Sequence, residues 1–165
     1  MCVGSESITG ATYSHWATVA RMSEAPASGK GLPPSTAQTR TEALGFLISS
    51  DWVLGEARDL HIVVPAAQIK RQFDRVKAQQ FRTRAQFEAF LRSSGETVAD
   101  LVFRVQLNLL SDRIQRHVLA VHRAPRATQR ALSRFVEVFK AKWEAQTYCA
   151  AEYAVQDCGH VQSVL

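Results

Sequence analysis

The sequence predicts an all-α protein, and three observations lead to that fold class. Apolar residues recur at helical spacing through most of residues 41–121, capping residues separate the segments of that stretch, and alternating patterns are confined to the two ends of the chain. We expect a multi-helix core, a helix that precedes it and a C-terminal helix that returns onto it.

The N-terminal part, residues 1–22, contains a short extended segment and a first helix. Val3–Ile8 suits a strand or an extended lead-in, and Thr9 is placed to cap a helix that carries Trp16 on its apolar side. Residues 23–40 combine prolines and glycines with few apolar side chains, which is the composition of a flexible linker.

The predicted core, residues 41–121, begins with two helices. Residues 41–60 are apolar on more than one side, which indicates a central helix with neighbours on two faces. The next helix begins at Val64–Pro65, because proline suits the first helical position, and it has a single apolar face.

Two further helices complete the core. Thr83 and Gln86 have the spacing of a capping box, and Gly95 is placed to end the helix that they begin. Thr97 and Asp100 open a long helix that is apolar on two sides although it contains arginines. Such a helix is expected to be packed by several partners.

The last predicted segment, residues 128–165, holds a closing helix and a tail that pack back on the core, so that the whole chain forms one domain. Pro125 predicts a break after the core, and Thr128 can cap the closing helix. Its apolar face includes Phe135, Phe139 and Trp143. Thr147–Cys158 alternates in polarity and suggests a small extended loop.

Composition excludes few classes of protein. The chain has 165 residues, a hydrophobic fraction of 46% and a net charge of +5, which permits an anionic partner without requiring one. No window is apolar enough for a membrane span. No nucleophile elbow, phosphate loop or dinucleotide motif is present, so the sequence indicates neither an enzyme nor a cofactor.

The cysteines leave three interpretations open. A Cys149–Cys158 bridge would close a loop of about ten residues and contribute about 2.7 kcal/mol in the chain-entropy model. A reduced pair is expected instead in a reducing compartment. Zinc binding by Cys149, Cys158 and His160 is a third interpretation, although the spacing differs from the usual short ligand pairs.

Histidine and basic residues offer weaker patterns. His117 and His122 are five residues apart, which is not the spacing that places two imidazoles on one helix face. A basic run indicates either a solvated polar face or contact with nucleic acid or anionic lipid, although no helix-turn-helix signature accompanies it. Its members are Arg113, Arg116, Arg123, Arg126, Arg130, Arg134, Lys140 and Lys142.

The stretch from Phe46 to Val118 resembles the SurA-like N-terminal chaperone domain of bacterial extracytoplasmic foldases of the PrsA type. The resemblance extends to both ends of the chain, through Ile8–Thr9 and His15–Trp16 and through the closing helix with its cysteine-containing tail. The residues that carry it are Phe46–Leu47–Ile48, Trp52, Glu56–Ala57, Val64, Phe73, Phe81, Phe87, Phe90–Leu91, Ser94–Gly95, Val105–Leu110, Phe135, Phe139, Trp143, Thr147, Cys149, Tyr153, Val155, Asp157 and Cys158.

The chain departs from this family in one major respect. Relatives usually carry a parvulin-type prolyl isomerase domain of roughly one hundred residues, the size of a typical domain, between the long helix and the closing helix. Here only residues 119–127 separate the two helices. The resemblance therefore implies a chaperone domain without isomerase activity.

The function that the resemblance implies is the holding of unfolded or exported polypeptides, with a full-length foldase or a second copy of the chain as further partners. The client-binding candidates are Phe46, Trp52, Phe103, Leu107, Phe139 and Trp143, for which ordinary core packing is the competing interpretation. A basic all-α nucleic-acid-binding or scaffold protein is the alternative function, and no specific nucleic acid is expected.

The resemblance implies an extracytoplasmic location, in the cell envelope or outside the cell. Members of that family have a signal peptide and often a lipid-modified cysteine. Cys2 would be the candidate for that cysteine if translation starts upstream. The first residues of this sequence show neither a basic region nor an apolar segment, so a start at Met1 favours the cytoplasm.

Overall fold

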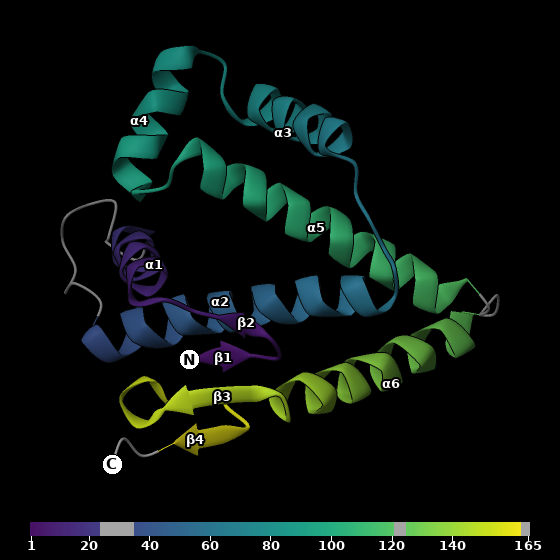
Figure 1. Cartoon of the computed structure of the whole chain (residues 1–165). Helices are drawn as coiled ribbons and strands as arrows, with labels where there is room; N and C mark the ends of the chain where they lie inside the picture. Colours follow the sequence, from purple (N-terminus) through teal and green to yellow (C-terminus); the bar gives the residue numbers. More distant parts are fainter. Residues whose placement is uncertain (24–34, 121–124, 163–165) are drawn as a thin grey trace. The chain divides into compact units, whose positions relative to one another are not determined.

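The computed structural model describes residues 1–23, 35–120 and 125–162 of the chain. The described part is broadly all-α, as the sequence predicts, with a small sheet formed by the ends of the chain (Figure 1). Its helices are α1 (Gly10–Ser23), α2 (Thr36–Asp59), α3 (Ala66–Gln80), α4 (Arg84–Ser94), α5 (Val98–Leu119) and α6 (Pro125–Glu144), with a short 3₁₀ helix, η1, at Ala151–Tyr153.

The chain forms two compact units. Unit 1 contains residues 1–8, 48–63 and 107–165, and unit 2 contains residues 9–47 and 64–106. Helices α2 and α5 contribute residues to both units. The sequence predicts a single domain. That the two units unfold together as one domain stays a prediction.

Unit 1 contains a four-stranded sheet in the order β2–β1–β3–β4. Its strands are β1 (Cys2–Val3), β2 (Glu6–Ser7), β3 (Thr147–Ala150) and β4 (His160–Gln162). Strand β1 pairs antiparallel with both β2 and β3, while β3 pairs parallel with β4. The predicted extended segments at the two ends of the chain are therefore strand partners of each other.

The closing helix α6 packs on α2 within unit 1. The indole of Trp52 lies 6.1 Å from the ring of Phe139, and Trp143 is only 4% exposed. Both tryptophans belong to a buried cluster with Val3, Ile48 and Cys149. The apolar face that the sequence assigns to the closing helix is thus the face that meets the core of unit 1.

A buried hydroxyl connects the two tryptophans of this cluster. Thr147 is fully buried, accepts a hydrogen bond from Trp52 Nε1 at 2.9 Å and donates one to the carbonyl oxygen of Trp143 at 2.7 Å. The Thr147 hydroxyl and the indole N–H of Trp52 are thereby both paired within the protein, as buried polar groups require.

A second network of buried polar contacts in unit 1 is centred on Glu56, whose side chain is only 8% exposed. It accepts hydrogen bonds from Trp143 Nε1 at 2.8 Å and from Lys142 Nζ at 2.6 Å, and Lys142 also contacts Asp59 at 2.7 Å. Burial alone lowers the pKa of Lys142, but the hydrogen bonds that Lys142 donates to the carboxylates of Asp59 and Glu56 outweigh burial and raise that pKa.

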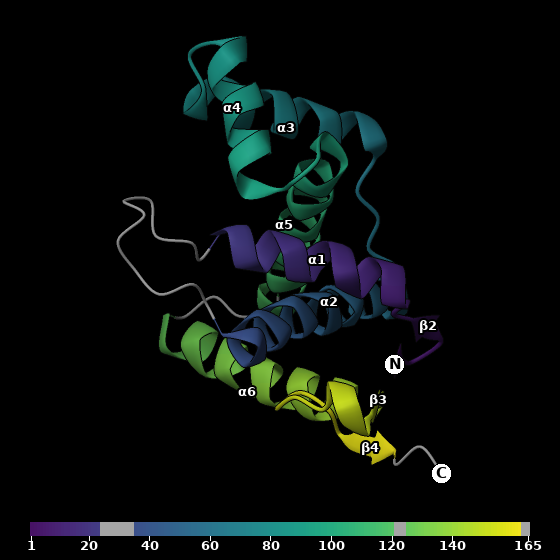
Figure 2. The ribbon, with the colours of Figure 1, turned by 90° about the vertical axis from the view of Figure 1, so that its left-hand side faces the viewer.

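Unit 2 confirms the predicted capping signals. The side chains of Thr83 and Gln86 form a reciprocal capping box at the start of α4, and Gly95 ends that helix in the left-handed conformation with φ of 70°. Thr97 and Asp100 cap α5 in the same way, and Thr9 caps α1. Figure 2 shows α1 and α4 next to each other in this unit.

Two predicted boundaries differ from the structure. Helix α2 begins at Thr36, so residues 36–40 are helical and not part of a linker; Ser35 and Gln38 form a capping box there. Helix α6 begins at Pro125 and contains Thr128, which the sequence places at its cap. Residues 24–34 of the predicted linker lie outside the described residues.

Within the described residues no helix combines the length and the apolarity that crossing a bilayer requires.

Candidate functional site

Unit 2 contains an apolar cleft, the aromatic cleft, formed by residues of α1, α2 and α5. It encloses about 370 Å³, which lies within the range of roughly 300–1,000 Å³ found for ligand pockets. Its lining is mainly apolar or small and consists of Trp16, Val19, Ala20, Ser23, Thr41, Glu42, Ala43, Gly45, Phe46 and Arg104.

Two aromatic rings form the firm part of this lining. Trp16 of α1 and Phe46 of α2 have ring centroids 4.1 Å apart, and Phe103 of α5 meets Phe46 edge-on at 6.3 Å. Trp16 is 6% exposed, whereas Phe46 and Phe103 are half-buried. The rings hold one another in place, and part of the Phe46 surface remains open to the cleft.

Arg104 of α5 lies across both rings. Its guanidinium carbon is 4.5 Å from the centroid of Phe46 and 5.0 Å from that of Trp16, so it makes a cation–π contact with each. Its Nε donates to Glu96 at 2.6 Å. The Glu96 side chain is 8% exposed and that of Arg104 is 41% exposed, so the ion pair has a buried anion and an accessible cation.

Helix α1 is fixed in unit 2 by polar contacts as well as by apolar packing. His15 Nε2 lies 2.9 Å from Asp100 Oδ2, and the sulfur of Met22 lies over Gly95, where a Cβ would come within 2.6 Å of it. Burial raises the pKa of Asp100, but hydrogen bonds from the Thr97 hydroxyl and amide, together with His15, outweigh burial and hold that pKa below its ordinary value.

The client-binding candidates from the sequence fall into two groups. The structure brings Phe46 and Phe103 together in the aromatic cleft. Trp52, Leu107 and Trp143 are 4–9% exposed in unit 1 and offer little surface to a ligand. Phe139 is half-buried and its ring contacts Trp52.

The sequence did not identify the ion pair at the cleft, which joins Arg104 of the lining to Glu96. A signal existed for Arg104, because it interrupts a helix that is apolar on two sides. Its role depends on Trp16 and Phe46, which lie far from it in the chain. Periodicity within one helix cannot supply such a contact.

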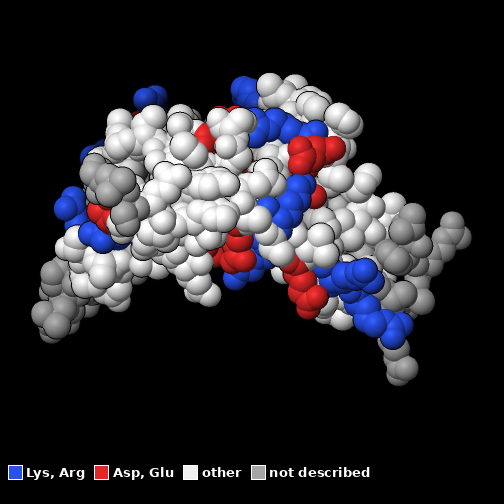
Figure 3. Space-filling view, turned by 60° about the horizontal axis from the view of Figure 1, so that its bottom comes forward, with Lys and Arg blue, Asp and Glu red and all other residues white. Residues whose placement is uncertain are grey.

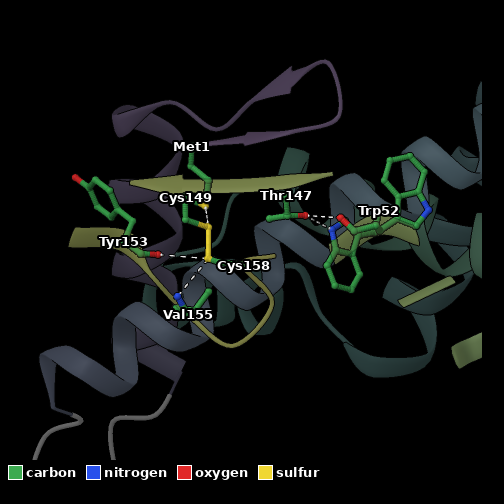
Figure 4. The surroundings of a disulfide bond; sticks show 8 residues. Met1, Trp52, Thr147, Cys149, Tyr153, Val155 and Cys158 are labelled. Atoms are coloured by element: carbon green, nitrogen blue, oxygen red, sulfur yellow. Dashed lines mark hydrogen bonds between the residues drawn. A yellow bond between two sulfur atoms is a disulfide. The ribbon is translucent and has the colours of Figure 1, made fainter. Parts of the chain in front are cut away.

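Cys149 and Cys158 in unit 1 lie at disulfide-bonding distance (Figure 4), and their Cα atoms are 5.9 Å apart. Cys149 is 1% exposed, its Sγ contacts Met1 Sδ at 3.3 Å, and the amide of Val155 donates to Cys158 Sγ at 3.3 Å. The two sulfurs face each other, and His160 Nε2 contacts the carbonyl oxygen of Ala145. This arrangement differs from the one that zinc binding requires.

A second, more polar hollow lies in unit 1 beside Trp143. It encloses about 750 Å³ and is lined by Gly4, Ser5, Gly55, Arg58, Asp59, His61, Trp143 and Gln146. The charged groups on it have partners, because Arg58 contacts Glu6 at 2.6 Å and Asp59 contacts Lys142. Burial and the nearby Glu6 raise the pKa of Asp51, on the same helix, to about 6, against the opposing effect of Arg58.

The basic run is partly neutralised where the structure describes it. Lys140 contacts Glu144 at 3.4 Å, and Lys142 is held by Glu56 and Asp59. Arg113 instead donates to the uncharged carbonyl oxygen of Val63. Figure 3 shows Lys and Arg atoms interspersed with Asp and Glu atoms beside a broad uncharged area. His117 is exposed, and the positions of His122 and Arg123 lie outside the described residues.

A scan against protein-family models and comparisons with curated proteins and with solved structures gave no match for this chain. The resemblance to the SurA-like domain therefore stays a prediction. The choice between functions depends on the geometry of the chain itself.

Proposed function

We propose that this protein is a chaperone-like holdase, which binds apolar segments of unfolded or exported polypeptides in the aromatic cleft and performs no covalent chemistry. The observation that carries the proposal is the cleft itself, an open cavity of about 370 Å³ with two aromatic rings and few polar groups. Concave apolar surface marks a binding site, and apolar contacts accept many sequences because they require no fixed hydrogen-bond pattern.

The position of Arg104 also supports polypeptide binding. Its guanidinium covers part of two rings and leaves 41% of its side chain accessible, so the cleft offers a cation beside an apolar wall. A peptide presents carbonyl oxygens or carboxylates next to its side chains, and these can accept hydrogen bonds from such a group. The resemblance to the SurA-like chaperone domain implies the same class of ligand.

An extracytoplasmic location belongs to this proposal. A cysteine pair at disulfide distance is typical of proteins in oxidising compartments, and the family that the sequence resembles works there. Exported polypeptides would then be the natural clients, and a full-length foldase or a second copy of this chain would be further partners.

The proposal is tested by filling the cleft without disturbing the core. A Cβ at Gly45 would meet no atom within 4 Å, so Gly45→Leu places a side chain in the cleft while α2 remains intact. We expect wild-type protein to suppress the light scattering of a diluted, chemically unfolded client and Gly45→Leu to lose most of that effect. Val136→Ser, which removes a 58% exposed valine of α6, is the matched control and should retain it.

Unchanged client aggregation at a several-fold molar excess of the wild-type protein would refute holding, and equal activity of Gly45→Leu would refute the cleft as its site. The alternative function, nucleic-acid binding, predicts a gel shift that weakens steeply between two salt concentrations. The pairing of Lys140 and Lys142 with carboxylates leaves fewer free cations for that role.

A further inference from the structure

We infer that the preferred ligand of the aromatic cleft is the C-terminal residue of a polypeptide, with its apolar side chain on Trp16 and Phe46 and its α-carboxylate on Arg104. This inference rests on the proposed function and names the chemistry that the cleft selects. It follows from three features: the anchoring of Arg104, the short distance between the cation and the apolar wall, and the charge of the remaining lining.

The first feature is that Arg104 is held by one edge only. Its Nε donates to the buried carboxylate of Glu96 at 2.6 Å, and its plane is held over two rings, so its orientation is fixed before any ligand arrives. No hydrogen bond joins Nη1 or Nη2 of Arg104 to another described residue. A guanidinium edge of this kind is suited to donate two charge-assisted hydrogen bonds to a carboxylate.

The second feature is distance. The guanidinium carbon lies 4.5 Å and 5.0 Å from the centroids of Phe46 and Trp16, so a ligand must present its anion and its apolar group within a few ångströms of each other. In a C-terminal residue both groups are bonded to the same Cα. In an extended internal segment, an acidic side chain and its apolar neighbour point to opposite faces of the strand. The geometry therefore favours a chain end over an internal acidic residue.

The third feature is the other charge on the lining. Glu42 is exposed on α2 and carries the only negative charge among the residues that line the described cleft. Glu42 has an interaction partner of its own. The affinity of the cleft for a carboxylate is therefore expected to depend on Arg104.

The experiment measures fluorescence anisotropy of labelled Gly/Ser octapeptides with the full-length, oxidised protein. One peptide ends in leucine as a free acid, a second ends in leucine amide, and a third carries the leucine internally, followed by two glycines. We expect the free acid to bind at least about tenfold more tightly than the amide, a ratio that corresponds to about 1.4 kcal/mol. This comparison uses the wild-type protein and does not depend on the folding of a variant.

Variants then assign the preference to the cleft. Arg104→Gln should reduce the affinity for the acid to that for the amide, and Arg104→Lys should retain part of the preference. Circular dichroism checks that each variant is folded. Equal affinity for acid and amide would overturn the inference, and so would an unchanged acid preference in folded Arg104→Gln.

The remaining outcomes separate this inference from the proposed function. One outcome combines three results: the internal-leucine peptide binds, Gly45→Leu abolishes that binding, and the acid and the amide bind equally well. In that case the holdase proposal survives and the C-terminal preference fails. If no peptide binds, both fail. If N-acetyl-leucine competes as strongly as the octapeptide acid, the ligand is a small apolar acid and the polypeptide source is overturned.

Discussion

We expect two glycines of α2 to respond in opposite ways to the same substitution, because only one of them faces a fixed ring. A Cβ at Gly55 would lie 2.0 Å from Cη2 of Trp143 and 2.6 Å from two further ring atoms, whereas a Cβ at Gly45 meets nothing within 4 Å. Trp143 is 4% exposed and its Nε1 is held by Glu56 at 2.8 Å, so the ring cannot easily move away.

The expected magnitudes follow from these distances. Alanine is more favourable than glycine inside a helix by about 0.8–1.0 kcal/mol, and an overpacked core costs about 1–3 kcal/mol. Gly45→Ala should therefore raise the free energy of unfolding by about 0.5–1 kcal/mol. Gly55→Ala should lower it by about 1–2 kcal/mol, which corresponds to a fall of about 3–6 °C in Tm for a chain of this size.

The assay is urea unfolding of both variants, followed by far-ultraviolet circular dichroism, with Tm as a second measurement. The comparison is internally controlled because both variants carry the same substitution in the same helix and therefore gain the same helix propensity. A Gly55→Ala protein as stable as Gly45→Ala would show that the close packing of Trp143 on α2 is incorrect. A loss of stability in Gly45→Ala would show that the wall of the aromatic cleft at this position is closed.

Three further perturbations test unit 1. Glu56→Ala should lower the free energy of unfolding in urea by about 3 kcal/mol, because it removes two charge-assisted hydrogen bonds and leaves the Trp143 N–H unpaired. The control Asp59→Asn, at an exposed carboxylate, should change that free energy by less than about 0.5 kcal/mol. Reduction of the Cys149–Cys158 disulfide should lower the free energy of unfolding by about 2.7 kcal/mol, which would appear as a lower urea midpoint in the presence of reductant. The pKa of Asp51 is raised from 3.8 to about 6 in the folded state, so deprotonation destabilises the fold as pH rises from about 4 to about 6. Asp51→Asn should remove this decline and stabilise the protein at pH 7 by about 1 kcal/mol, after allowance for solvent screening of a half-buried group, as urea unfolding at pH 4 and pH 7 would show.

Local signals made much of the helical fold predictable. The Thr83–Gln86 capping box, the Gly95 stop and the Thr97–Asp100 cap depend on residues three or four apart, and the structure forms all of them. The Ser35–Gln38 box has the same spacing, but it lies inside a stretch whose composition indicates a linker. Composition averaged over such a stretch therefore concealed the true start of α2.

Contacts between distant parts of the chain were less predictable. Strand β1 has only two residues and pairs with a β3 strand that follows at residue 147, so no local alternation could reveal their register. The burial of Glu56 was similarly hidden, because its partners Lys142 and Trp143 are 86 and 87 residues away. A carboxylate on a helix normally indicates a solvated face, and only the complete fold supplies the donors that pair this one.

Two buried carboxylates of the described residues, Glu56 and Glu96, show why the proposed function is placed in unit 2. Glu56 accepts hydrogen bonds from the indole N–H of Trp143 and from the ammonium group of Lys142. Because Trp143 is itself buried, this ion pair stabilises the packing of a core. Glu96 instead fixes a cation whose side chain is 41% exposed beside an open cavity. A buried ion pair is weak support for stability but well suited to hold a charged group in one orientation. An arginine fixed beside apolar surface is the arrangement expected where a ligand has both an anion and an apolar group.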